Sequence, residues 1–248
     1  LYEADDLQDS IRHLNETVYS EDLAKIDRAE NFEVALSNSL NKTYNEALSL
    51  CPVKELVDVL TYRFAFHNIK VAVKEKILQE NFEHIYSKVH YEDLDNLRKQ
   101  FETEKGEKGT WYEDTVIQAY KTFEETKDPE KIEFFIDKRY FEKVLEISKK
   151  LELDLVEEYF RAMIDFVNIR TFIRCKRQEQ DISVLKEALI QGGYIDIDDI
   201  SSYFYKEIQD LVNAHKNSKI GKSLFLGLKG YNETGRLLLF EKYMENYL

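Results

Sequence analysis

The chain has 248 residues, of which 43% are hydrophobic, and a formal net charge of −13. The hydrophobic content is enough for a folded core, which argues against disorder, and the acidic balance argues against nucleic acid as a main partner, because phosphate binding needs clustered Lys and Arg. With only 2 Pro and 8 Gly among many helix-forming residues, we predict an all-α fold. No apolar run reaches the roughly eighteen residues that span a bilayer, so any membrane association is expected to be indirect.

The first half of the chain predicts an amphipathic helix followed by a long buried one. The amphipathic pattern runs from Asp6 to Thr17. Pro52 stands where a second helix should begin, and from Val53 to Leu78 apolar residues cover more than one helical face. We therefore expect this helix to be surrounded by others. A charged, Gly-containing loop is predicted from Glu102 to Gly109.

The same order of elements then returns. A second amphipathic pattern covers Trp111 to Lys127, and Asp128 with Pro129 is typical of an N-cap followed by the first helical residue. A second long apolar helix is predicted from Leu155 to Ile173. After it, we expect Gly192 and Gly193 to adopt left-handed turn conformations that stop a helix ending at Ile190.

A third amphipathic pattern, from Phe204 to Ser218, resembles the first two and continues to Tyr243. The sequence thus predicts two helical units and the opening of a third, with approximate bounds 1–109, 110–200 and 201–248. Internal repetition of this length is typical of a fold built from similar helical units.

Short sequence motifs that occur twice, here called words, support this repetition. Phe66-His-Asn-Ile-Lys70 returns one hundred positions later as Phe166-Val-Asn-Ile-Arg170, and Leu40 to Glu46 matches Ile136 to Glu142. Asn is a poor residue for a helix interior, and a buried charge is costly unless it is paired. We expect Asn68 and Asn168 to bond backbone groups at a helix end or a close helix crossing.

Cations follow each Asn on one helical face. Arg170, Arg174 and Arg177 are spaced at i, i+4 and i+7, and Lys70 and Lys74 hold the matching places in the first unit. The internal interpretation pairs them with Asp137 or with a carboxylate of a neighbouring unit, such as Glu142, Glu157 or Glu241. The docking interpretation makes Arg174 and Arg177 partner-facing, while Asn68, Lys70, Asp137, Asn168 and Arg170 form polar contacts between units.

Catalytic, cofactor and metal motifs are not predicted. Gly221-Lys222-Ser223 could end a phosphate loop, but the first glycine of that motif, five positions before Gly221, is absent because position 216 is Lys. Glu80 and His84 share a helical face in the predicted helix, but the matching Glu-x-x-His of a di-iron bundle is absent. Cys51 and Cys175 form no CxxC pair, which supports neither a disulfide framework nor a zinc site and is typical of reduced, cytosolic thiols. The remaining glycines, Gly227, Gly230 and Gly235, predict a flexible connection.

Taken in order, these short sequence motifs resemble those of the C-type subunit of prokaryotic V/A-type rotary ATPases. That subunit corresponds to the d-type subunit of the eukaryotic vacuolar enzyme. The words that carry the resemblance are Phe66-His-Asn-Ile-Lys70, Ile136-Asp-Lys-Arg-Tyr-Phe-Glu142, Ile164-Asp-Phe-Val-Asn-Ile-Arg-Thr-Phe-Ile-Arg174 and Ala188-Leu-Ile-Gln-Gly-Gly-Tyr-Ile195. The resemblance is strong from about Ile132 to Ile195 and diffuse before Leu50. Family members also carry an N-terminal helix with Tyr and Arg and a third Asn-x-Arg word, so this chain resembles a member that lacks both ends.

The resemblance implies a funnel-shaped protein of three similar helical units with pseudo-threefold symmetry. It implies a non-catalytic subunit without a cofactor, on the cytoplasmic face of the membrane, that links the central stalk to the membrane rotor ring. Torque would pass through it between ATP hydrolysis or synthesis and transport of H+ or Na+. The implied partners are stalk subunits of the D and F types and the ring proteolipids, with the membrane stator subunit as a further candidate.

Two other functions remain open from the residues alone. A helical repeat scaffold that binds a protein or peptide ligand would show the same periodicity. A helical metalloenzyme or nucleotide hydrolase would use the Glu80 and His84 pair or the turn at Gly221.

Overall fold

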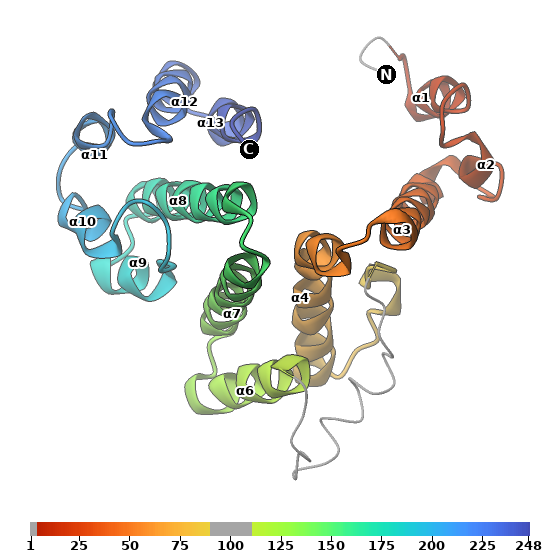
Figure 1. The fold of residues 1–248 in the computed structure, drawn as a ribbon, viewed down its shortest axis with the longest axis horizontal. Helices are drawn as coiled ribbons and strands as arrows, with labels where there is room; N and C mark the ends of the chain where they lie inside the picture. The colour runs from red at the N-terminus through yellow and green to blue at the C-terminus, as the bar shows by residue number, and fades with distance from the viewer. Residues whose placement is uncertain (1–3, 90–110) are drawn as a thin grey trace. The chain divides into compact units, whose positions relative to one another are not determined.

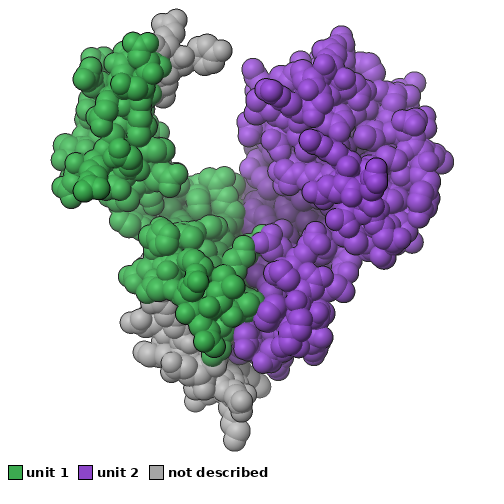
Figure 2. Space-filling model, turned by 180° about the vertical axis from the view of Figure 1, so that it is seen from behind, with its two compact units in different colours: residues 1–116 green, residues 117–248 purple. Residues whose placement is uncertain are grey.

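The computed structural model describes residues 4–89 and 111–248. These residues form an all-α structure without a β-strand, as the composition predicts (Figure 1). The chain divides into two compact units, unit 1 at Leu1–Val116 and unit 2 at Ile117–Leu248 (Figure 2). The finer boundaries near residues 110 and 201, and the threefold pseudosymmetry, stay predictions. The predicted loop from Glu102 to Gly109 lies outside the described residues.

Unit 1 is built on two long helices. Its elements are α1 (Leu7–Leu14), α2 (Ser20–Leu23), the 3₁₀ helix η1 (Ala29–Asn31), α3 (Phe32–Leu50), α4 (Lys54–Leu78) and the 3₁₀ helix η2 (Glu83–Ile85). α1 begins after Asp6, whose side chain accepts a hydrogen bond from the Asp9 backbone N–H at 2.8 Å. α4 begins just after Pro52, which confirms the predicted long helix, and its buried residues lie on several of its faces.

Unit 2 repeats a long helix pair and adds shorter helices. After α6 (Trp111–Thr126), which crosses the boundary between the units, come α7 (Pro129–Leu151), α8 (Asp154–Arg177), α9 (Ile182–Ala188), α10 (Ile197–Ser202), α11 (Ile208–Ala214), α12 (Gly221–Thr234) and α13 (Leu237–Glu245). Asp128 caps α7 by accepting from the Glu130 N–H at 2.9 Å, with Pro129 in the first turn, as predicted.

The helix pairs α3–α4 and α7–α8 correspond to each other. Each pair packs together within its own unit, and the duplicated words lie at matching places: the Leu40 and Ile136 words on α3 and α7, and the Asn words on α4 and α8. The residue before each second helix also has the same backbone conformation, with φ −106° and ψ 87° at Val53 and φ −108° and ψ 97° at Leu153. The duplication seen in the sequence is therefore a duplication of one helix pair.

α8 lies at the centre of the unit 2 core. Its side chains Phe166, Ile169 and Phe172 pack in one cluster with residues from α9 to α13. The largest fully buried side chains of this cluster include Phe240 of α13, and α12 and α13 lie side by side (Figure 1). Burial on nearly all faces explains why α8 carries apolar residues all round.

Several helix ends differ from the predictions. α9 ends at Ala188, before Ile190, and of the two following glycines only Gly192 is left-handed, with φ +104°. The predicted helix from Phe204 to Ser218 shortens to α11, Ile208–Ala214.

The helices α4, α6, α7 and α8 end on residues other than glycine. The left-handed residues that follow them are Gln79, Lys127, Glu152 and Glu179, with φ between 52° and 55°. Glycine is the usual residue in this conformation, so these helix ends carry no glycine signal in the sequence.

The glycines of α12 do not form a flexible connection, which corrects the prediction. Gly227 and Gly230 are buried inside the helix, where a Cβ would lie 2.8 Å from Phe240 and 2.8 Å from Leu239. They allow α13 to approach α12 closely. Gly235 supplies the left-handed turn between the two helices, with φ +67°.

Candidate functional site

Asn168, in the middle of α8, forms hydrogen bonds with the backbone of a loop of unit 2. Its side chain is fully buried, donates from Nδ2 to the Ile190 carbonyl oxygen at 2.8 Å, and accepts at Oδ1 from the Ile190 N–H at 2.9 Å. Ile190 is itself buried and lies beyond the end of α9, so its backbone has no helical partner. A buried backbone N–H and C=O need partners, and the Asn168 amide satisfies both.

Asn68 makes the same pair of bonds in unit 1. It is buried in α4, donates to the Ser87 carbonyl oxygen at 3.1 Å and accepts from the Ser87 N–H at 2.8 Å. In both copies the partner is the backbone of the residue that directly follows a helix C-cap, Ile190 after Leu189 of α9 and Ser87 after Tyr86 of η2, so both bonds lie just past a helix end. Both bonds join residues of the same unit.

In unit 2, a buried carboxylate makes further hydrogen bonds to the loop that Asn168 binds. Asp165 lies on α8 with no exposed surface, and its two oxygens accept from the backbone N–H groups of Tyr194 and Ile195, each at 3.0 Å. Burial raises the pKa of Asp165 to about 6, while the two N–H donors and the nearby Arg161 act in the opposite direction. Gly193 lies against this carboxylate, because a Cβ there would be 2.1 Å from Oδ1.

Arg161 holds the same loop from one turn earlier on α8. It donates to the Gly193 carbonyl oxygen at 3.1 Å and to Glu157 at 3.3 Å, and its guanidinium lies 4.9 Å from the centre of the Tyr194 ring. Lys219 approaches the same ring at 5.1 Å. Sequence reasoning missed this arrangement, because Asp165 matches Ala65 in the first copy and therefore did not appear in the comparison of the two words.

Unit 1 holds its connecting segment with other groups. Glu75 of α4 accepts from the Phe82 N–H at 2.7 Å and from the Tyr86 hydroxyl at 2.9 Å. His67 Nε2 lies 3.0 Å from the Ile85 carbonyl oxygen. In both units, therefore, side chains of the long helix bind the backbone of a segment that follows it. The Asn is common to the two units, and the polar residues next to the Asn differ.

The structure brings Arg170 and Arg174 together at one carboxylate. Glu241 of α13 lies 3.7 Å from Arg170 and 3.6 Å from Arg174. Burial and the neighbouring charge of Arg174 lower the pKa of Arg170, whereas Glu241 and Asp137 raise it. Of the three glutamates that the sequence offered as partners, Glu241 is the one that pairs with these arginines.

The other candidate residues lie elsewhere. Glu142 pairs with Arg139 at 3.1 Å, and Glu157 pairs with Arg161. Arg177 is exposed in the last turn of α8, and within residues 4–89 and 111–248 no carboxylate pairs with it. Lys70 is half-buried on α4.

The structure contradicts the geometry expected for Glu80 and His84. α4 ends at Leu78, Gln79 is left-handed, and His84 lies in η2, so the two side chains do not share a helical face. Across the part of the chain that the structure describes, no group of three or more His, Cys, Asp or Glu residues could hold a metal ion. Gly221 is the buried first residue of α12, where a Cβ would lie 2.3 Å from the Lys216 carbonyl oxygen, so close packing explains this glycine.

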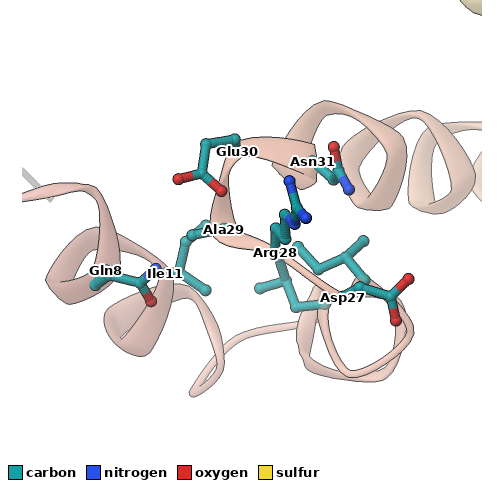
Figure 3. A pocket seen from close by; sticks show the side chains of 9 residues that line it. Gln8, Ile11, Asp27, Arg28, Ala29, Glu30 and Asn31 are labelled. Carbon is teal, nitrogen blue, oxygen red and sulfur yellow. The ribbon is translucent and has the colours of Figure 1, made fainter.

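An open hollow of about 690 Å3 lies in unit 1 (Figure 3). Gln8 and Ile11 reach it from α1, Leu23 is the last residue of α2, and the other side chains come from the segment between α2 and α3 (Figure 3). The lining residues are Gln8, Ile11, Leu23, Ile26, Asp27, Arg28, Ala29, Glu30 and Asn31. Its charged residues are exposed or half-exposed, which leaves them hydrated and gives the hollow no grouping suited to acid–base or nucleophilic chemistry.

Comparisons with known proteins agree with the resemblance seen in the sequence. The profile of the ATP synthase (C/AC39) subunit family matches residues 1–248. The C-type subunit of the V-type sodium ATPase of Enterococcus hirae is 24% identical over 180 residues, which cover 72% of this chain and 55% of that protein. The C-type subunit of the A-type ATP synthase of Methanocaldococcus jannaschii is 18% identical, with 100% of this chain and 67% of that protein covered.

A third relative is the C-type subunit of the A-type ATP synthase of Methanothermobacter thermautotrophicus, 23% identical over 235 residues, which cover 87% of this chain and 60% of that protein. The chain therefore spans between 55% and 67% of the length of these relatives. Among the described helices, none combines the length and the apolar character needed to cross a bilayer.

Proposed function

The chain belongs to the ATP synthase (C/AC39) subunit family, and we propose that it is a non-catalytic subunit of a V/A-type rotary ATPase that joins the central stalk to the membrane rotor ring. The observation that carries this proposal is the match of the family profile to residues 1–248. The relatives from V-type and A-type enzymes, each named as the C-type subunit, support it.

In this role the subunit transmits torque, coupling transport of H+ or Na+ to ATP hydrolysis or synthesis. Its partners are the stalk subunits of the D and F types on one side and the ring proteolipids on the other, with the membrane stator subunit as a further neighbour. It acts at the cytoplasmic face of the membrane and is held there through these proteins.

The internal bonds of each unit suit a part that carries load. A torque-bearing adaptor must resist the separation of its helices from the segments that connect them. Buried amide and carboxylate contacts resist such movement because each broken bond leaves an unsatisfied polar group, at a cost of about 1 to 3 kcal/mol. We propose that Asn68, Lys70, Asp137, Asn168 and Arg170 keep the helices of this subunit in fixed orientation, and that Arg174 and Arg177 face a partner.

Co-purification tests this function. The full-length protein should be co-expressed with the central-stalk subunits of its own complex, and separately with the membrane ring in detergent. We expect the protein to purify with each of the two. Failure to join either one, with the protein itself folded and helical by circular dichroism, would remove the proposal.

A further inference from the structure

One carboxylate serves two guanidinium groups at the C-terminal end of α8. Glu241 lies within 3.7 Å of both Arg170 and Arg174. The Arg170 side chain is 33% exposed, whereas that of Arg174 is 53% exposed. Burial and the charge of Arg174 lower the pKa of Arg170, while Glu241 and Asp137 raise it. Glu241 shares one negative charge between the two guanidinium groups, and Asp137 acts on Arg170 as well, so Arg174 is the cation that is only partly compensated.

Arg177 extends this charge toward the end of the helix. It lies seven residues after Arg170, so its side chain is on the same face of α8, and it is exposed. The partial negative charge of a helix C-terminus offsets only a fraction of a unit charge. In a chain with a net charge of −13, Arg174 and Arg177 thus form an exposed cationic site.

The positive charge of this site favours an acidic protein surface as its partner. Guanidinium groups bind carboxylates in a planar, two-point geometry, and the spacing of Arg174 and Arg177 along one face suits acidic residues one turn apart on a partner helix. A lipid surface is a poorer fit. Electrostatic membrane sites need about four to eight clustered Lys or Arg, and the acidic chain as a whole is repelled by anionic headgroups.

We propose that Arg174 and Arg177 bind an acidic helical face of a central-stalk subunit, and that Glu241 competes with this partner as an internal counter-ion of Arg174. This inference rests on the proposed function. It assigns Glu241 a role that the sequence did not suggest, namely to weaken the contact with the stalk. Binding of the stalk then exchanges the Glu241 carboxylate for a carboxylate of the partner.

Charge reversal of the site is the first test. The full-length protein carrying Arg174→Glu and Arg177→Glu should bind the purified stalk subunits about tenfold more weakly at low salt, with the difference shrinking at high salt. The matched control is Lys149→Glu with Lys222→Glu, which reverses two exposed cations of the same unit and lowers the net charge equally. Equal weakening by both double variants would overturn the proposal, because net charge alone would then explain the effect.

Removal of the counter-ion is the second test. Glu241→Gln should strengthen stalk binding about threefold at low salt, because the ion pair between Glu241 and Arg174 then no longer has to be broken. Glu245→Gln, on the same helix and exposed, should have no such effect. Unchanged or weaker binding of the Glu241 variant, with its unfolding midpoint retained, would overturn the role given to Glu241.

These tests separate the inference from the proposed function. If the wild-type protein joins the stalk and the charge reversal leaves this binding unchanged, the cationic site is wrong while the function stands. If the wild-type protein joins neither stalk nor ring, the proposed function itself fails. Vesicles that contain anionic lipid form the third arm, and loss of vesicle binding without loss of stalk binding in the reversal variant would overturn the assigned partner.

Discussion

In unit 1, Asn68 holds the backbone of Ser87, and in unit 2, Asn168 holds the backbone of Ile190. The surroundings of these equivalent bonds differ. Beside Asn168 lies Asp165, whose buried carboxylate takes two more backbone N–H groups, whereas unit 1 has Ala65 at the matching position. The amide is the shared element, and the carboxylate is an addition that carries the cost of burying a charge.

Loss of the amide in unit 2 should have the largest effect. Asn168→Ala leaves the buried N–H and C=O of Ile190 without partners, and each unsatisfied group costs about 1 to 3 kcal/mol, so we expect a loss of about 4 kcal/mol in the free energy of unfolding. Denaturant unfolding, with hydrogen exchange at the Ile190 amide, measures this loss. The exposed Asn246→Ala serves as the control. A change below about 1 kcal/mol, close to the usual range of surface substitutions, would show that the bond does not hold the loop.

The carboxylate should make the stability of unit 2 depend on pH. Because the pKa of Asp165 is raised from 3.8 to about 6 in the folded protein, the folded state favours the protonated form. Its contribution to stability is therefore fully present below pH 3.8 and is lost as the pH rises through 6, by about 3 kcal/mol in total. Asp165→Asn should remove this dependence.

The measurement compares the unfolding free energies of the two proteins from about pH 4 to about pH 8, where the raised pKa has its effect. Other groups titrate in both proteins, so the difference between wild type and Asp165→Asn isolates the carboxylate. A difference that stays constant over this range would contradict the buried, raised-pKa state of Asp165.

A methyl group at Gly193 should disturb the same contact. Its Cβ would lie 2.1 Å from Asp165 Oδ1, so Gly193→Ala should cost about 2 kcal/mol through overpacking. In the background of Asp165→Ala, the same change should cost much less, because the clashing carboxylate is gone and only the 3.3 Å contact with Ile164 Cγ2 remains tight. A double-mutant cycle measures this coupling, and additive effects of the two changes would exclude the contact.

The corresponding loss in unit 1 should be the smallest. Asn68→Ala frees the backbone of Ser87, a residue that is half-buried, so water can replace part of the lost bonding. We expect a loss of about 1 to 2 kcal/mol, seen as faster hydrogen exchange at Ser87 with little change at Ile190. A loss as large as that of Asn168→Ala would show that burial of the partner does not set the difference between the units.

The helices and their repetition could be predicted because they depend on local patterns. Apolar residues on all faces marked α4 and α8, and Asp128 with Pro129 marked the start of α7. The apolar pattern from Val53 to Leu78 ends where α4 ends, but the left-handed Gln79 that stops the helix is not glycine, so nothing in the sequence indicated that Glu80 and His84 lie beyond it. The expected pairing of Glu80 with His84 on one helix was wrong for that reason.

The site was harder to predict because its bonds join residues distant in the sequence. The duplicated Asn indicated a polar residue with a structural role. Its partners, Ser87 and Ile190, are bonded through backbone atoms, so their residue types could not identify them. Asp165 has no copy in unit 1, so a comparison of repeats passed over it. The glutamate that pairs with Arg170 could be named only as one of several, since the packing of α13 against α8 decides among them.

Rotation tests the central claim, that this protein carries torque from the stalk to the ring, most directly. The complex is reconstituted with its ATP-hydrolysing headpiece fixed to a surface and a particle attached to the membrane ring, with and without the full-length protein. Our account predicts that ATP drives rotation of the particle only when the protein is present. Rotation at the same rate without it, or no rotation in a fully assembled complex that contains it, would contradict the account.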